Sequence, residues 1–290
     1  MKKGITLGSF LIIITLTLAP TSSDAFNPLA HIYIAENACP SCSPKIDFFY
    51  GSVAPDLAWS VADPDDKWKT VLFDTHYRDI RRFALGSTQE AFAAGWLTHS
   101  ENDDQPGADY YAHIYYTNSL YAGYVKDTSM ELLNQDPTGK LNLEFSHYVI
   151  EATIDFMLID IDPSLPGKLL FANLFRSWED RNLMMRVFVW RWWDKSTDWK
   201  TVAGAEFAFR QLINRYAIAF MLSDPEEALA QLAVELAKEV YNLDIDADDL
   251  LNILEVAIDL CEEDANQNQT PDYLDVINDE VIPAVSDQLN

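Results

Sequence analysis

The feature that most constrains the fold is a histidine followed four residues later by a carboxylate, which occurs twice: His99 with Asp103, and His147 with Glu151. Both pairs fall in stretches whose apolar residues recur with a helical period, so in a helix each pair lies on one face, one turn apart. An imidazole nitrogen and a carboxylate oxygen placed in this way can bind one metal ion, and such ligands suit zinc. The sequence therefore predicts helices that carry metal ligands. For the first pair, a solvated acidic turn with flanking histidines is the alternative.

The helix expected to carry His99 has recognisable ends. Ser87 followed by Glu90 is typical of a capping box at a helix start. Pro106 and Gly107 should end or kink the helix. His113 would then approach the metal from a different direction.

The remaining histidines, His31 and His76, have their own sequence context. Asn27 is a suitable N-cap and Pro28 a suitable first helical residue, so His31 is expected in the first turns of a helix. His76 follows a turn-rich segment that contains Asp56, and loops often carry ligands.

Residues 1–25 have the pattern of a secretory signal peptide: Lys2 and Lys3, then an apolar run, then small residues before Phe26. An uncleaved membrane anchor is the alternative, but an apolar run of roughly 15 residues is shorter than the roughly 20 that a spanning helix needs. Cleavage would place a free amine at Phe26, close to His31. The protein is thus expected to be secreted or periplasmic.

Composition limits the partners. A hydrophobic content of 49% over 290 residues is sufficient for a substantial core. The 46 acidic and 20 basic residues give a formal net charge of -26, which disfavours nucleic acid as a partner because a polyanion would be repelled.

The order of these segments resembles the bacterial zinc-dependent phospholipase C family, whose superfamily includes the fungal single-strand nucleases. The similarity covers roughly residues 26–160. It implies an all-α, multi-helix fold with two or three zinc ions, one of them bound by the mature N-terminal residue. By position, the ligands of the first zinc would be Asp56, His76, His99 and Asp103, those of the second His113, His147 and Glu151, and those of the third His31, Phe26 and a bridging aspartate.

The chain departs from the family pattern in the spacing between the bridging aspartate and the next histidine. The family usually separates the two by a few residues, whereas His113 lies ten residues after Asp103, so an insertion is implied. Asp109 lies four residues before His113 and is the second candidate for the bridging ligand. We favour Asp103. The N-terminal residue also departs, because the family typically begins with tryptophan and this chain offers Phe26.

The resemblance implies a zinc-dependent phosphoric diester hydrolase, with phospholipase C-like cleavage of a phospholipid or related phosphate ester by metal-activated water. Asp56 is expected to orient or deprotonate that water, or to serve as a plain ligand. Phe73 matches a position that contacts the substrate head group, but Leu57 stands where a tyrosine is usual. The alternatives are a single-strand nuclease-like phosphodiesterase and a non-catalytic exported metal-binding protein.

Three units are expected: the signal peptide at 1–25, a helical phospholipase C-like domain at 26–235, and an acidic helical extension at 236–290. The extension contains a possible calcium-binding loop, resembling the short repeats of secreted proteins, with the oxygen ligands Asp264, Asn266, Asn268, Asp272 and Asp275. A solvated acidic turn is the alternative.

Other segments allow simpler expectations. Cys39 and Cys42 should form a local disulfide, and Cys261 should be a buried thiol on a helix. The segment 127–143 is expected to be a linker. A tryptophan cluster is either core or a patch for transient contact with a membrane surface, and its members are Trp190, Trp192, Trp193 and Trp199.

Overall fold

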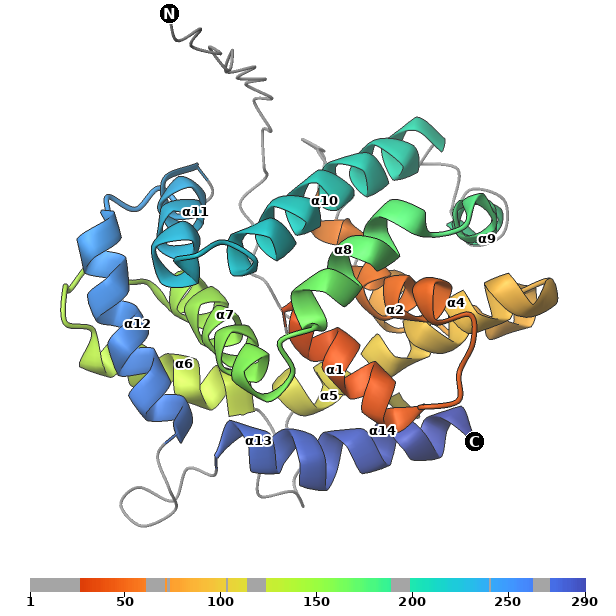
Figure 1. The fold of residues 1–290 in the computed structure, drawn as a ribbon, viewed down its shortest axis with the longest axis horizontal. Helices are drawn as coiled ribbons and strands as arrows, with labels where there is room; N and C mark the ends of the chain where they lie inside the picture. Colours follow the sequence, from red (N-terminus) through yellow and green to blue (C-terminus); the bar gives the residue numbers. More distant parts are fainter. Residues whose placement is uncertain are drawn as a thin grey trace, which may run out of the picture.

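The computed structural model is built almost entirely of helices, so the all-α expectation is confirmed (Figure 1). It describes residues 27–60, 71, 74–102, 104–113, 124–188, 199–239, 241–262 and 272–290. The expected signal peptide lies outside these residues. Within the described part of the chain, no helix is both long and apolar enough to cross a membrane.

The first half of the chain supplies the helices around the candidate site. Its elements are α1 (Pro28–Ala38), α2 (Lys45–Val53), the 3-10 helices η1 (Ala54–Ser60) and η2 (Arg81–Phe83), α4 (Gly86–His99), the strands β1 (Glu101–Asn102) and β2 (Gln105–Pro106), α5 (Ala108–His113), α6 (Tyr124–Gln135) and α7 (Leu143–Ile161). The two strands pair in antiparallel fashion as a short hairpin between α4 and α5.

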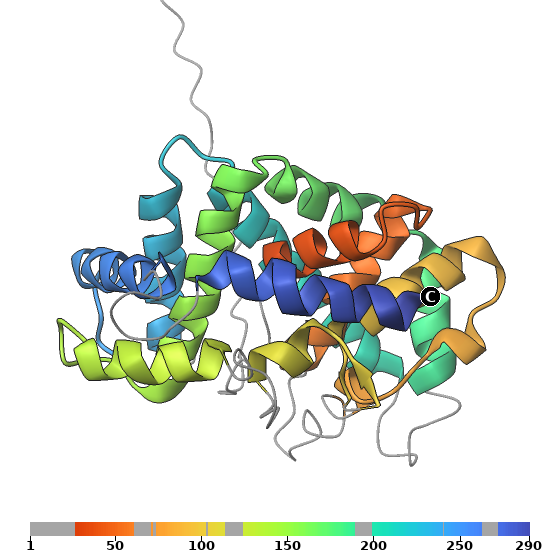
Figure 2. The ribbon, with the colours of Figure 1, turned by 90° about the horizontal axis from the view of Figure 1, so that it is seen from below.

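The second half covers this group with further helices. Its elements are α8 (Leu165–Phe175), α9 (Trp178–Phe188), α10 (Trp199–Phe220), α11 (Pro225–Glu239), α12 (Ala247–Glu262), α13 (Tyr273–Val276), the π-helical η3 (Ile277–Val281) and α14 (Ile282–Leu289). The last three elements form one continuous helical segment, which lies beside α1 in both views (Figures 1 and 2).

Two glycines allow α2 and α4 to cross at very short range. A Cβ atom on Gly51 would lie 2.1 Å from the carbonyl oxygen of Phe92, and one on Gly95 would lie 2.0 Å from that of Phe48. Neither helix could approach the other this closely with a larger residue at the crossing. The contact brings the C-terminal end of α4 against α2, where His99 reaches the Ser52 carbonyl oxygen.

Local expectations about helix starts had mixed outcomes. Helix α1 begins at Pro28 after Asn27, as predicted, although the Asn27 side chain makes no capping hydrogen bond. The predicted capping box at Ser87 is wrong, because α4 already begins at Gly86, whose positive φ turns the chain into the helix. Instead, the Leu85 N–H donates to the side chain of Gln89 at 2.9 Å.

Two further expectations concern chain organisation. The predicted linker at 127–143 is wrong in its first part, because α6 is a helix that buries Val125 and Leu132 against α7. The proposed boundary between residues 235 and 236 falls inside α11, and the hydrophobic core continues from Leu29 to Val285 without a break at that point.

The cysteine expectations are confirmed. Cys39 and Cys42 form a disulfide, and Cys261 is a buried free thiol on α12.

Candidate metal centre

Five chemistry-bearing side chains from separate segments meet in one buried cluster, which we call the histidine–aspartate cluster. His31 comes from α1, Asp56 from η1, His76 from the helical turn at 74–76, His99 from the last residue of α4, and Asp109 from the first turn of α5. All five residues are buried. The backbone thus assembles residues that are up to 78 positions apart, from His31 to Asp109.

Among the described residues, two overlapping groups of three side chains could each hold a metal ion: His76, His99 and Asp109, and His31, Asp56 and His99. The His76 and His99 Nε2 atoms are 3.2 Å apart. Asp56 Oδ1 lies 3.7 and 3.4 Å from them, and Asp109 Oδ2 lies 3.3 and 2.8 Å from them. Ligand atoms that bind zinc tetrahedrally at about 2.0–2.1 Å are separated by about 3.3 Å. The donor set and its spacing therefore fit zinc.

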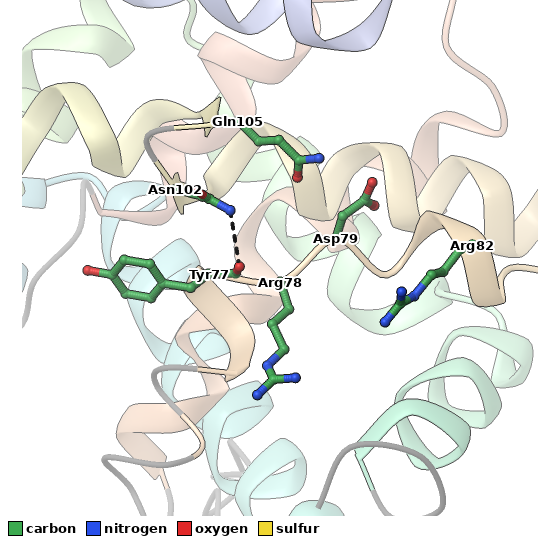
Figure 3. Close-up of a pocket in the computed structure, with 6 residues that line it drawn as sticks. All are labelled: Tyr77, Arg78, Asp79, Arg82, Asn102 and Gln105. Atoms are coloured by element: carbon green, nitrogen blue, oxygen red, sulfur yellow. Dashed lines mark hydrogen bonds between the residues drawn. The ribbon is translucent and has the colours of Figure 1, made fainter.

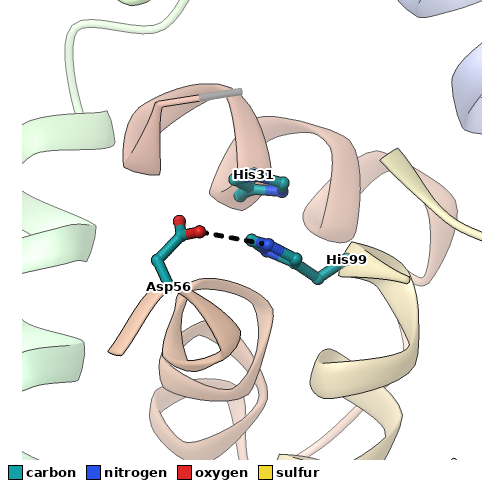
Figure 4. A group of neighbouring side chains, drawn as sticks. All are labelled: His31, Asp56 and His99. Carbon is teal, nitrogen blue, oxygen red and sulfur yellow. Dashed lines mark ion pairs between the residues drawn. The ribbon is translucent and has the colours of Figure 1, made fainter. Parts of the chain in front are cut away.

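The two carboxylate oxygens of Asp109 have different neighbours. Its Oδ2 atom lies beside the Nε2 atoms of His76 and His99, while its Oδ1 atom lies 3.2 Å from His31 Nε2. The imidazoles of His31 and His99 stack with ring centroids 3.9 Å apart, and His99 also faces Asp56 (Figure 4). Asp109 thus has the geometry of a carboxylate that bridges two adjacent metal positions, one of which includes His31.

This arrangement favours the second candidate, Asp109, over Asp103 as the bridging ligand. The prediction that His99 and Asp103 share a helical face is wrong, because α4 ends at His99 and the chain turns into the β1–β2 hairpin. Asp103 itself lies outside the described residues.

Outer contacts fix the orientation of the two central imidazoles. His99 Nδ1 lies 2.8 Å from the carbonyl oxygen of Ser52, which can only accept, so Nδ1 carries the proton. His76 Nδ1 lies 2.8 Å from the Thr75 hydroxyl. Histidines that bind metals usually donate the other ring N–H to such a partner. The lone pair of His99 Nε2 therefore points into the cluster.

Charge balance in the cluster shifts several pKa values. Burial alone would lower the pKa of His76, but contacts with Asp109 and Asp56 raise it to about 9. His99 shows the same competition, and its pKa is raised well above the ordinary value by the charges of Asp109 and Asp56. Burial would raise the pKa of Asp56, but the charge of His99 and contacts with both histidines lower it to about 2. Both carboxyl groups are held in their ionised, metal-binding form, since the pKa of Asp109 is also well below the ordinary range.

The second predicted helical pair is confirmed on α7. His147 Nε2 lies 2.9 Å from Glu151 Oε1, and both residues are buried. The side chain of His113 lies outside the described set, so the grouping of these three residues as a second metal site stays a prediction.

Sequence reasoning missed a residue one turn further along α7. Asp155 Oδ2 accepts from the Leu29 N–H at 2.9 Å, and its Oδ1 accepts from the Ala30 N–H at 2.7 Å. The Tyr216 hydroxyl donates to Oδ2 at 3.0 Å. Asp155 therefore caps α1 directly before His31. Its four-residue spacing from Glu151 was a signal that it shares the inner face of α7.

Several predicted residues fall where the structure gives no description. Phe26 and Phe73 lie outside the described residues, as do Asp264, Asn266, Asn268, Trp190, Trp192 and Trp193, and the same holds for the side chain of Trp199. Of the calcium candidates, Asp272 caps α13 by accepting from the Leu274 N–H at 2.7 Å, and Asp275 lies in the first turn of that helix.

A surface pocket borders the segments that follow two cluster histidines. It has a volume of about 370 Å³, and its lining residues are Tyr77, Arg78, Asp79, Arg82, Asn102 and Gln105 (Figure 3). The Asn102 side-chain amide donates to the Tyr77 carbonyl oxygen at 3.3 Å, which joins the chain after His76 to the hairpin after His99.

Comparison with known proteins gives no relative: no family model, no curated protein and no solved structure matches this chain. The functional conclusion therefore depends on the geometry and chemistry of the histidine–aspartate cluster.

Proposed function

We propose that this protein is an exported zinc-dependent phosphoric diester hydrolase that acts on a phospholipid or a related phosphate ester, in the manner of the phospholipase C family it resembles. The observation that carries the proposal is the convergence of His76, His99 and Asp109 at separations close to the edge of a zinc tetrahedron, beside the overlapping group of His31, Asp56 and His99.

A single zinc site would be compatible with a structural role, but the bridging position of Asp109 favours hydrolysis. A carboxylate shared between two metal positions is typical of sites in which neighbouring ions act on one phosphate group. Zinc held there supplies Lewis acidity and an activated water. In this chain His76, His99 and Asp109 would hold the first ion, while His31 and Asp56, with the second oxygen of Asp109 beside His31, would contribute to a neighbouring one.

Asp56 is suited to orient the attacking water. Its side chain is 10% exposed, whereas those of His31, His76, His99 and Asp109 are fully buried, so solvent meets the cluster at Asp56. We therefore assign it hydrogen bonding to the water as well as metal binding.

The test begins with metal content and substrate range. A mature chain that begins at Phe26 should bind two or three zinc ions and hydrolyse phosphatidylcholine and a soluble chromogenic phosphodiester faster than single-stranded DNA. Preferred cleavage of DNA would support the nuclease alternative, and bound zinc without turnover would support the metal-binding alternative.

Variants then test the ligand assignment. His99→Ala should lose zinc and lose hydrolysis, because His99 belongs to both groups that could hold an ion and removing one of three ligands leaves an ion weakly held. Asp104→Asn is the matched control, since Asp104 is an exposed acid on the neighbouring hairpin turn. Unchanged zinc content and activity in the His99 variant would show that the assignment is wrong.

A further inference from the structure

Large apolar side chains are exposed together where α8, α9 and α10 meet. Phe171, Leu174 and Phe175 lie on α8, Trp178 begins α9, and Phe207 lies on α10. Each is exposed by 49% or more, and Trp178 reaches 71%. Scattered exposed apolar residues are ordinary, but a grouped set marks an interaction surface. We call these five residues the α8–α10 apolar face.

Two of the five side chains are in contact, and the helices that carry most of the set pack together. The rings of Phe171 and Phe175 stack with centroids 5.4 Å apart. Arg176, directly after Phe175, pairs with Glu206, directly before Phe207. The α8 and α10 helices lie side by side in Figure 1, as their packing requires. Phe175 and Phe207 therefore each lie one residue from the same contact between α8 and α10.

This face differs in charge from the rest of the molecule. The chain has 46 acidic residues, yet the segment from Pro163 to Trp178 contains no aspartate or glutamate. On α10 the one acidic residue, Glu206, is buried and paired with Arg176. The basic Lys168 nearby pairs with Glu36 and Asp162. The face is thus apolar and poor in acidic residues within a protein of formal net charge -26, and the half-buried Glu179 directly after Trp178 is the acidic residue at its edge.

We propose that the α8–α10 apolar face docks onto a zwitterionic lipid surface. Exposed phenylalanine, leucine and tryptophan side chains are the residues that enter the boundary between lipid head groups and acyl chains. A neutral lipid surface presents no charge that would repel the acidic molecule. A second copy of this chain fits less well, because two molecules with a charge of -26 each repel one another. None of the five residues belongs to the tryptophan cluster considered in the sequence, which lies outside the described side chains.

Binding to vesicles tests this inference independently of the proposed function. The mature chain is sedimented with phosphatidylcholine vesicles, both as purified and after EDTA treatment. We expect it to partition onto the vesicles, and the Phe175→Ser/Trp178→Ser double variant to partition at least tenfold less in both states. The single variant Trp178→Ser should show an intermediate loss. Zinc content and hydrolysis of the soluble chromogenic phosphodiester should be unchanged, because none of these residues belongs to the histidine–aspartate cluster.

A matched control separates a specific surface from general hydrophobicity. Met130 is 47% exposed on α6, which packs mainly against α5, α7 and α12 rather than against the helices of the α8–α10 apolar face. Met130→Ser should bind vesicles like the wild type. Equal binding by the double variant and the wild type, or no vesicle binding by the wild type, would overturn the proposal. So would a dimer, detected by light scattering, that the double variant abolishes, since the occupant would then be a second copy.

Discussion

Substitution of Gly95 by alanine should weaken both the fold and the metal site, although the side chain of residue 95 is not a ligand. The added Cβ atom would lie 2.0 Å from the Phe48 carbonyl oxygen and 2.9 Å from the Ser52 nitrogen. Both are backbone atoms of α2, so they cannot move aside by changing a rotamer. Ordinary contact begins at 3.4 Å, and α2 and α4 must therefore separate locally by 1.4 Å, the difference between 3.4 and 2.0 Å.

This separation has two consequences of different size. Overpacking costs about 1–3 kcal/mol, and replacing a helical glycine returns up to about 1 kcal/mol, so we expect a net loss of about 1–2 kcal/mol, towards the upper end because both clashing atoms belong to the backbone. The same movement would stretch the 2.8 Å contact between His99 Nδ1 and the Ser52 oxygen beyond hydrogen-bonding distance. Loss of such an outer partner typically lowers metal affinity by about 10–100-fold.

Urea unfolding and competitive zinc titration measure these effects, and Gly204→Ala provides the control. A Cβ atom on Gly204 would meet nothing within 4 Å, so alanine in this helix should stabilise the protein by about 0.5–1 kcal/mol and leave zinc affinity unchanged. If Gly95→Ala is as stable as the wild type and binds zinc equally well, the close crossing of α2 and α4 does not position His99.

Three further changes test other parts of the structure. Asp155→Ala should leave the first-turn N–H groups of α1 without their cap and reduce the zinc bound near His31. Zinc analysis would then find less zinc per protein molecule than in the wild type. Tyr216→Phe keeps both N–H contacts of Asp155 and should lower the zinc content less. Burial and the adjacent Asp47 carboxyl raise the pKa of Asp180 from 3.8 to about 9. The contribution of the protonated Asp180 carboxyl to the free energy of unfolding is therefore complete below pH 3.8 and is lost as the pH rises through 9. Between these values the free energy of unfolding falls by up to about 1.4 kcal/mol per pH unit. Urea unfolding at several pH values should show this slope in the wild type and not in Asp180→Asn, and parallel curves would refute it. One additional residue before Phe26 should move the N-terminal amine by about 3.8 Å and lower zinc content and hydrolysis, because a zinc–nitrogen bond is about 2.0 Å; equal zinc content and rates would refute an N-terminal ligand.

The sequence predicted best those parts of the site that depend on neighbouring residues within one helix. His147 and Glu151 are on one face of α7 because four-residue spacing has a fixed meaning once a helix forms. The start of α1 at Pro28 and the disulfide between Cys39 and Cys42 are similarly local.

The prediction from sequence was wrong where the position of a helix end decides which aspartate reaches the histidine–aspartate cluster. Extending the helical spacing past His99 selected Asp103, but the chain leaves the helix at His99 and forms a hairpin, after which α5 brings Asp109 to the cluster. The spacing of apolar residues within a helix does not indicate where that helix ends. The capping role of Asp155 and the Ser52 carbonyl contact also depend on packing between helices, which spacing within one helix does not specify.

The two carboxylates of the histidine–aspartate cluster require compensating positive charge. Asp56 and Asp109 bring two negative charges into a buried site. Uncompensated buried charges are strongly destabilising, so the cluster needs either two protonated histidines or one divalent cation. Despite burial, contacts with the two carboxylates raise the pKa of His76 to about 9 and that of His99 well above its ordinary value, which supplies the charge in the first way. The zinc ion that we propose would balance the same two charges and would be bound by both imidazoles in their neutral form, while the remaining oxygen of Asp109 stays directed at His31.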